Sequence, residues 1–304
     1  MSITPFISSF FDPATNTVTY LVTDLQTRQA AVIDPVLDFE PATGIASTGS
    51  ADQLLAFAAS QGARIVLSLE THVHADHLTA SAYIKAKTGA AVGIGENVRK
   101  VQAIFDPVFG LTDQLPDGAD FDHLFEDGAH IALGALDIEV LHVPGHTPAD
   151  VAYKIGDAVF TGDTIFMPDF GSARCDFPGG DARQLYHSVR RLLALPDETR
   201  LFCGHDYKTT IRNENRWETT VGEQRAQNIH VRDCVDEDSF VTLRMARDAT
   251  LPPPRLLQSS IQVNICAGKV PAQTRERGNP VSAGPVAHLA RDTAPIVSPW
   301  QSTK

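Results

Sequence analysis

The strongest constraint on the fold is a dense group of polar residues between two predicted elements of regular structure. The apolar run at 64–70 predicts a buried strand, and residues 78–89 have helical spacing and end at a glycine. Between them lies THVHADH at 71–77, which holds three histidines and an aspartate. Open α/β folds place their active sites in loops of this kind, after the carboxyl end of a strand. The sequence therefore predicts an α/β fold with a functional loop at 71–77.

The rest of the chain carries similar strand and helix patterns on both sides of this loop. The predicted elements are strands at 17–24 and 29–36, a helix at 51–62, a strand at 135–145, a hairpin at 151–163 that turns at Gly156-Asp157, an amphipathic helix at 181–196 with Asp181 as its N-cap, a strand at 200–207, and a last strand at 259–268. Polar, helix-prone residues lie between the last two strands.

Composition limits the partners that the protein can have. The chain has 304 residues, a formal net charge of −12 and 43% hydrophobic residues, which is enough for a large core. An acidic protein repels phosphate backbones and anionic lipid, so neither nucleic acid nor a membrane is expected as a partner. The start lacks the basic and long apolar segments of a signal peptide, and no apolar run is long enough to span a membrane. We therefore expect a cytoplasmic protein.

Two further features concern thiols and domain limits. The four cysteines are spread along the chain without a CxxC pair, which predicts inert, reduced thiols. Residues 271–304 are rich in Pro, Gly, Ala and Thr and show no clear period. We expect a catalytic domain at 1–270 and a poorly ordered C-terminal extension at 271–304. The extension could take part in a homodimer, on which the sequence is silent.

Seven potential metal ligands lie in four separate stretches near predicted strand ends. They are His72, His74, Asp76 and His77 in the first loop, His146 in PGHTP, Asp163 in FTGD and His205 in CGHDY. Three histidines so close together would repel one another on protonation unless something keeps them neutral, and a bound metal does so directly. Imidazole and carboxylate ligands suit zinc, iron or manganese. The pattern therefore predicts a metal site.

These stretches also carry a family resemblance. The motifs HxHxDH, GHT, TGD and GH, in this order, resemble those of the metallo-β-lactamase superfamily, which implies a four-layered αββα sandwich. LETHVHADHLTAS, SARCDFPGGDARQLYHSV and CGHDY look most like the persulfide dioxygenases related to ethylmalonic encephalopathy protein 1, and the chain is also similar to glyoxalase II. The likeness covers roughly residues 1–270.

The dioxygenase resemblance implies one iron(II) ion per chain, held by His72, His146 and Asp163. Such a facial triad of two histidines and one carboxylate leaves positions open for a sulfur donor and O2. The implied reaction oxidises glutathione persulfide to sulfite and glutathione. The remaining potential ligands would then orient the triad through hydrogen bonds. They are His74, Asp76, His77 and His205.

The glyoxalase II resemblance implies a different use of the same side chains. Two zinc ions would activate a bridging hydroxide for the hydrolysis of thioesters or lactones. One zinc would be bound by His72, His74 and His146, the other by Asp76, His77 and His205, and Asp163 would bridge them. The ligand types do not separate this alternative from the mononuclear iron site.

Two residues are candidates for substrate binding. Arg174, in the loop SARCDFPGG, has a guanidinium that matches a substrate carboxylate, although a structural salt bridge with Asp176 or Asp169 would explain it equally well. Tyr207 matches a position where glutathione-using relatives have a substrate-binding tyrosine. The expected partners are thus a small-molecule thiol or persulfide and O2.

Three nearby residues are open to two interpretations each. Lys208 and Arg212 follow the tyrosine and would supply positive charge for a peptide thiol, or belong to a solvated helix face. Cys175 stands where several family members have threonine; a thiol near iron would either affect oxidation or be a bystander, and we expect a bystander.

Overall fold

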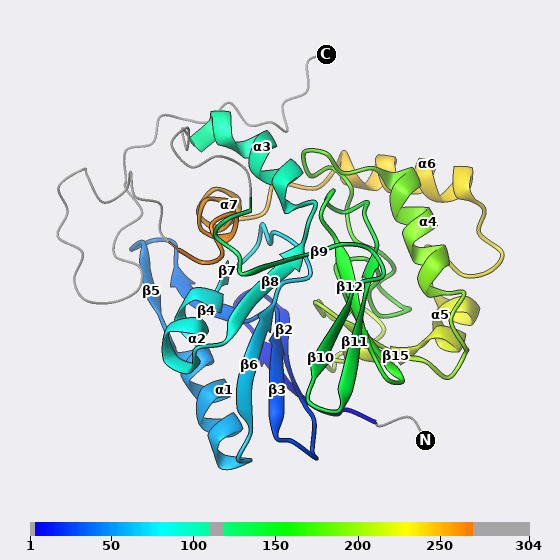
Figure 1. The fold of residues 1–304 in the computed structure, drawn as a ribbon. Helices are drawn as coiled ribbons and strands as arrows, with labels where there is room; N and C mark the ends of the chain where they lie inside the picture. The colour runs from blue at the N-terminus through cyan, green and yellow to red at the C-terminus, as the bar shows by residue number, and fades with distance from the viewer. Residues whose placement is uncertain (1–3, 110–117, 270–304) are drawn as a thin grey trace.

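Two six-stranded sheets form the centre of the protein in the computed structural model, which describes residues 4–109 and 118–269 (Figure 1). The first sheet has the order β1-β2-β3-β6-β8-β9 and the second β10-β11-β12-β13-β14-β15. The strands of the first are Phe6–Asp12, Thr17–Thr23, Gln29–Ile33, Arg64–Leu69, Ala91–Gly95 and His123–Phe125. Those of the second are His130–Leu133, Leu136–His142, Val151–Ile155, Ala158–Gly162, Arg200–Cys203 and Glu218–Thr220. A small third sheet joins β5 (Ile45–Ser47), β4 (Val36–Glu40) and β7 (Leu78–Thr79).

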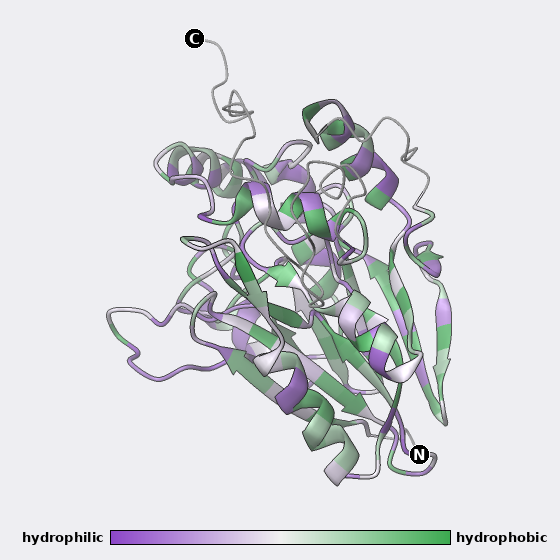
Figure 2. Cartoon of the chain, turned by 90° about the vertical axis from the view of Figure 1, so that its left-hand side faces the viewer, coloured by the Kyte–Doolittle hydropathy of each residue, from purple (hydrophilic) through white to green (hydrophobic). Residues whose placement is uncertain are grey.

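The main core lies between the two large sheets. Strand side chains alternate between faces, so Tyr20 and Val22 of β2 enter this core while Leu21 faces the other way. From the second sheet Tyr153 and Phe160 meet them, and Tyr20 packs 5.1 Å from the ring of Phe160. Because both faces are covered, the central strands are apolar along most of their length, as the hydropathy colouring in Figure 2 shows.

Helices cover the outer face of each sheet and complete four layers. On the first sheet lie α1 (Gly49–Ser60) and α2 (Ser81–Thr88), and on the second lie α4 (Ala182–Leu192), α5 (Val221–Gln227) and α6 (Glu237–Asp248) (Figure 1). The N-cap prediction is confirmed, because Asp181 accepts hydrogen bonds from the backbone N–H groups of Arg183 and Gln184. The predicted αββα architecture is confirmed as well. Within 4–109 and 118–269, every helix is too short or too polar to cross a membrane.

One predicted strand is wrong. The segment 259–268 lies mostly in a helix, α7 (Leu257–Asn264), which packs near α3 (Val98–Phe109) in a core shared by both (Figure 1). Its alternating Ile261, Val263 and Ile265 suggest a strand, but in the helix all three are buried, and the polar Asn264 is buried with them. The prediction failed because a short apolar run fits both periods. The strand predicted at 200–207 also ends earlier, at Cys203.

Strand direction brings the functional loops to one edge. In the second sheet β11 and β12 are antiparallel, β12 and β13 are antiparallel, and β13 and β14 are parallel. The carboxyl ends of β11, β13 and β14 therefore point the same way, and β6 ends beside them in the first sheet. The proposed extension at 271–304 lies outside the described residues.

Candidate metal centre

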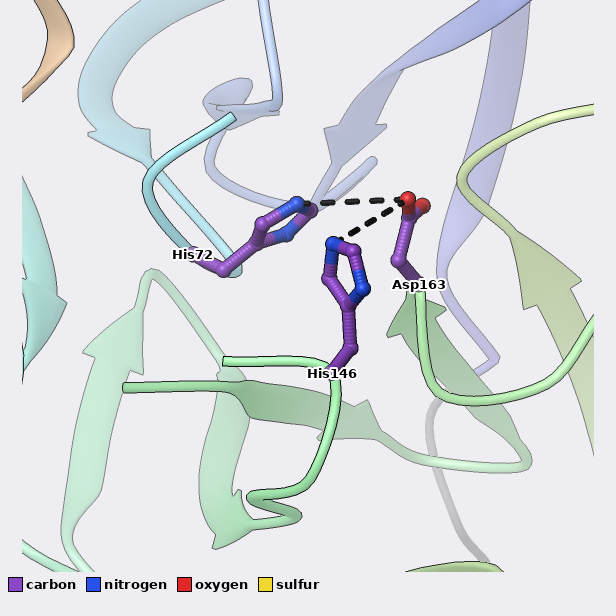
Figure 3. A group of neighbouring side chains, drawn as sticks. All are labelled: His72, His146 and Asp163. Carbon is purple, nitrogen blue, oxygen red and sulfur yellow. Dashed lines mark ion pairs between the residues drawn. The ribbon is translucent and has the colours of Figure 1, made fainter. Parts of the chain in front are cut away.

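The structure brings together all seven side chains that the sequence singles out, at the seam between the two sheets. Figure 3 shows His72, His146 and Asp163 converging from three separate loops. The Oδ2 atom of Asp163 lies 4.0 Å from Nε2 of His72 and 3.8 Å from Nε2 of His146. Two ligand atoms that each lie about 2.0–2.2 Å from one ion can be up to about 4.4 Å apart. The spacing thus fits one shared ion.

In His72 and in His146, the ring nitrogen that points away from Asp163 is hydrogen-bonded to the protein. The Nδ1 atom of His146 lies 2.7 Å from the carbonyl oxygen of Arg174, which only accepts, so Nδ1 carries the proton. Nδ1 of His72 lies 3.0 Å from Oγ1 of Thr71, which itself donates to Asp34 and therefore accepts from His72. Both partners leave the lone pair on Nε2, the atom that faces Asp163. These tautomers are the ones that a metal ligand requires.

The other three histidines follow the same rule. His74 donates from Nε2 to Asp34 at 3.0 Å, which leaves its Nδ1 for the centre. His205 approaches the carbonyl oxygen of Asn16 with Nδ1 at 3.2 Å, and His77 approaches Oγ1 of Thr17 with Nδ1 at 3.3 Å. Their Nε2 atoms are left for the centre. Five imidazoles thus present five free nitrogens to one small volume.

Several buried polar atoms at this seam have no hydrogen-bond partner among the described residues. They are Nε2 of His72, His77 and His205, Nδ1 of His74, Oδ2 of Asp76 and Oδ1 of Asp163. A buried polar atom without a partner costs about 1–3 kcal/mol, so a cluster of them is not a stable end state for an ordinary core. Bound metal would satisfy these atoms. The residues therefore fit a metal centre.

The electrostatics of the site differ from ring to ring. Burial, with His74 and His146 close by, holds the pKa of His72 well below its usual range, so this ring is neutral. Burial lowers the pKa of His205 too, but the carboxylates of Asp163 and Asp76 outweigh it and raise that pKa. The Nε2 atom of His205 lies 3.3 Å from Oδ1 of Asp163 and 3.4 Å from Oδ2 of Asp76. His205 is thus placed between two carboxylates.

Sequence reasoning missed the groups that hold the ligand loop in place. Asn264 of α7 donates to the carbonyl oxygens of His74 and His77 and accepts from the backbone N–H of Thr79. Glu70 accepts hydrogen bonds from Thr79 and Ser81, and its other oxygen lies 3.3 Å from His74. No local pattern marks Asn264, because its partners lie almost 190 residues earlier. The acidic Glu70 next to the motif was the one available signal.

Glycines before two of the ligands follow from close contacts. Gly145 precedes His146 with a φ of 146°, and a Cβ there would collide with the backbone of Leu185 in α4. Gly162 precedes Asp163 with a φ of 49°, and a Cβ there would collide with the side chain of Thr71. The position before each of these two ligands therefore has no room for a side chain, which explains the glycine in the motifs PGH and TGD.

A cavity of about 470 Å³ opens onto this centre, with Asp76, His146 and Asp163 among its lining residues. That volume suits a small-molecule ligand. Tyr207 lines it too and stacks on His205, with ring centroids 5.5 Å apart and an angle of 17° between the planes. Arg174 lines it but is bound through Nε and Nη2 to the carboxylate of Asp176, at 2.5 and 2.6 Å. Of the two salt bridges considered from the sequence, the structure contains the one with Asp176.

The neighbouring candidates are placed differently. Arg212 is bound by the carboxylates of Asp169 and Asp206, so its charge is already neutralised. It and Lys208 lie between β14 and β15 outside any helix, so the interpretation as a helix face is wrong. The thiol of Cys175 is buried, and burial raises its pKa far above the ordinary value. Such a thiol is protonated and unreactive, which agrees with a bystander.

The fold and these motifs together define the class of the protein. The sequence pattern of the metallo-beta-lactamase superfamily matches residues 12–205. The chain belongs to this superfamily, whose members bind metal, and it is an enzyme of that class.

Several known proteins resemble the chain more closely. It is 49% identical to a beta-lactamase hydrolase-like protein of Xylella fastidiosa over 88% of this chain, but spans only 62% of that protein. It is 43% identical to glyoxylase B2 of Dictyostelium discoideum over 83% of the chain and 87% of the relative. It is 29% identical to the human persulfide dioxygenase ETHE1 over 86% and 88%. The crystal structure of ETHE1 from Myxococcus xanthus superposes with a TM-score of 0.71 at 31% identity, covering 86% of this chain and 99% of the other.

Proposed function

We propose that the protein is a mononuclear non-haem iron(II) dioxygenase that oxidises glutathione persulfide to sulfite and glutathione. The observation that carries the proposal is the group of His72, His146 and Asp163, whose ligand atoms all lie within 4.8 Å of one another. Two imidazoles and one carboxylate are the ligand set of oxygen-using iron enzymes, which keep other positions open. The similarity to persulfide dioxygenases supports the substrate.

His205 has a different role with one ion than with two. Its Nε2 atom lies within ion-pair distance of both Asp76 and Asp163, and these carboxylates raise its pKa. With two ions, Nε2 of His205 would be a metal ligand; with one ion, the protonated ring would donate from Nε2 to these carboxylates. In this arrangement His205 fixes the orientation of Asp163, whose second oxygen is left for the ion.

Iron, when bound, would supply the redox chemistry that no side chain here can provide. The chain's own residues provide position and shielding. The ring of Tyr207 lies against Phe170 at 5.0 Å and against Phe166 at 6.0 Å, and together the three rings form an apolar wall of the cavity. The overall reaction consumes one persulfide, one O2 and one water and yields thiol, sulfite and two protons.

A second candidate function has its own observation. His74, Asp76 and His77 also bring three ligand atoms within 4.8 Å of one another, which is where a second ion would lie. Two zinc ions there would favour hydrolysis of a thioester or lactone. The hydrolase and glyoxylase names of the relatives at 49% and 43% identity support this alternative.

The two functions separate under defined metal loading. Metal-free protein is reconstituted without oxygen with Fe(II) or with Zn(II), then given glutathione persulfide and O2. Because zinc normally outcompetes Fe(II) for such ligands, the metal found after expression is not the test. The iron form should bind one ion per chain, consume O2 and produce sulfite. The zinc form should neither consume O2 nor produce sulfite.

A different result would favour the hydrolase. If the zinc form rapidly hydrolyses S-lactoylglutathione, and His77→Ala loses one of two bound ions, the dioxygenase proposal fails. Under the dioxygenase proposal, His77→Ala keeps its single iron and loses about 10–100-fold in activity.

A further inference from the structure

Four arginines line the cavity above the metal centre of a chain whose net charge is −12. Two of them are neutralised by carboxylates. Arg174 is bound by Asp176, and Arg244 donates from Nε and Nη2 to Oδ1 of Asp248, at 2.9 and 2.6 Å. These two arginines belong to the lining of the cavity, and their charges are already paired.

The other two are Arg247, in the last turn of α6, and Arg255, which follows the three prolines at 252–254. Across residues 4–109 and 118–269, neither guanidinium has a hydrogen bond or an ion pair with a carboxylate. Asp248, the acidic residue next to Arg247, is already taken by Arg244. The mouth of the cavity therefore holds positive charge without an acidic partner.

A row of rings connects this charge to the metal centre. Tyr207 stacks on His205, Phe170 packs 5.0 Å from Tyr207, and the guanidinium carbon of Arg247 lies 5.7 Å from the centroid of Phe170. A ligand bound at the metal by one end would lie along this row. Its other end would meet Arg247, since all of these residues except His205 line the same cavity.

We propose that Arg247, together with Arg255 of the same cavity lining, is a carboxylate-binding subsite at the mouth of the cavity. The site would then select sulfur compounds that carry a carboxylate several bonds from the sulfur, such as a small peptide thiol, over neutral thiols of similar size. This inference rests on the proposed function only for the sulfur end of the ligand. Guanidinium is suited to the role because it can bind both oxygens of a carboxylate in parallel.

The test compares a peptide thiol that has free carboxylates with the same thiol after both carboxylates are esterified. Binding of glutathione and of glutathione diethyl ester to the metal-loaded protein is measured by calorimetry, for the wild type, Arg247→Gln and the double variant with Arg255→Gln. A hydrogen-bonded charge contributes on the order of ten- to a hundredfold in affinity. Arg247→Gln should weaken glutathione by this factor and leave the ester within about twofold. Arg247→Lys should restore part of the loss.

The matched control is Arg64→Gln, which removes the same charge from an exposed position at the opposite end of β6. It should change neither affinity. With glutathione persulfide as substrate, Arg247→Gln should raise KM and keep kcat within a few-fold. Equal glutathione binding by wild type and Arg247→Gln, a parallel loss for the ester, or a fall in kcat with unchanged KM would each overturn the subsite.

These results are independent of whether the enzyme is a dioxygenase. If no sulfite forms but Arg247→Gln still weakens glutathione and spares the ester, the proposed function fails and the subsite stands. If sulfite forms and the variant behaves like the wild type, the proposed function stands and the subsite fails.

Discussion

The two ends of the cavity are built in opposite ways. At the metal end the rings of His72 and His77 are at most 1% exposed, and each has one nitrogen fixed by a protein oxygen. At the mouth Tyr207 is 41% exposed and, like Arg247, is held by ring contacts. The metal end has the rigid geometry that a preorganised site needs, whereas the groups at the mouth remain available to a ligand that comes and goes. One cavity thus combines a rigid site for metal with a more open site for a ligand that binds and leaves.

The largest effect is expected at the metal end, from Asp163→Ala. The variant loses the one carboxylate of the triad, so turnover should fall by more than the ~10–100-fold that loss of an outer hydrogen-bond partner costs. Metal content and O2 consumption are measured together, with circular dichroism to check the fold, which the large core should preserve. His72→Ala should behave alike, and Asp137→Ala, at an exposed residue, is the control. Substantial activity in Asp163→Ala would show that the triad is wrongly assigned.

The next effect concerns the part of the cavity lining that contains Arg174 and Arg244. Arg244 is 1% exposed, binds Asp248 and donates to the carbonyl oxygen of Ser172, so it anchors the loop that contains Arg174. Arg244→Met leaves the buried carboxylate of Asp248 without its partner and should cost about 3–5 kcal/mol of unfolding free energy. Urea denaturation measures the loss.

The double variant Arg244→Met with Asp248→Leu is the control for this effect. It removes both charges and should recover most of the stability. If the free energy of unfolding of the single variant falls by less than about 1 kcal/mol, the ion pair does not stabilise this part of the cavity lining.

A smaller effect separates support of the metal from support of the fold. Asn264→Ala removes three hydrogen bonds to the loop at 74–79 and should weaken metal binding by about 10–100-fold. Competition with a chelating dye measures the metal affinity. Asn213→Ala, which removes an exposed amide, should leave it unchanged. A variant that is less stable but binds metal as tightly as the wild type would show that Asn264 serves the fold alone.

The smallest effect lies outside the cavity. Asp181→Ala removes the N-cap of α4 and should cost about 1 kcal/mol, because two backbone N–H groups lose their acceptor. Asp181→Ser should retain most of the stability, since serine is also a good cap. Thermal unfolding compares the two variants. Turnover should change little, and a large loss would mean that α4 also positions the turn before His146.

The sequence predicted the parts of the protein that depend on local patterns. The loop at 71–77, the hairpin turn at Gly156-Asp157 and the cap at Asp181 each involve neighbours in the chain, and the structure confirms the turn and the cap. The convergence of the seven ligands could be expected because strands of one direction end at one edge.

Long-range contacts explain what could not be predicted. The helix α7 looks like a strand by its apolar spacing, and its helical form is stabilised by packing in the core that contains Phe105 and Phe177. The partners of Arg174 and Arg212 were undecided because several aspartates lie nearby in sequence, and only the folded loops select among them. Arg247 lacks an acidic partner because Asp248 forms its ion pair with Arg244. No local sequence pattern reveals this pairing.

The division of the sheets along the chain has a consequence for protein synthesis. Every strand of the first sheet lies before residue 126, and every strand of the second lies between residues 130 and 220. At about 5–20 residues per second, on the order of ten seconds separates the translation of His77 from that of His205. During this interval a nascent chain offers three histidines and an aspartate without the partners that complete the site, and free ions would be taken in the order of affinity, in which zinc precedes iron. The complete set of ligands therefore exists only after the second sheet has been synthesised.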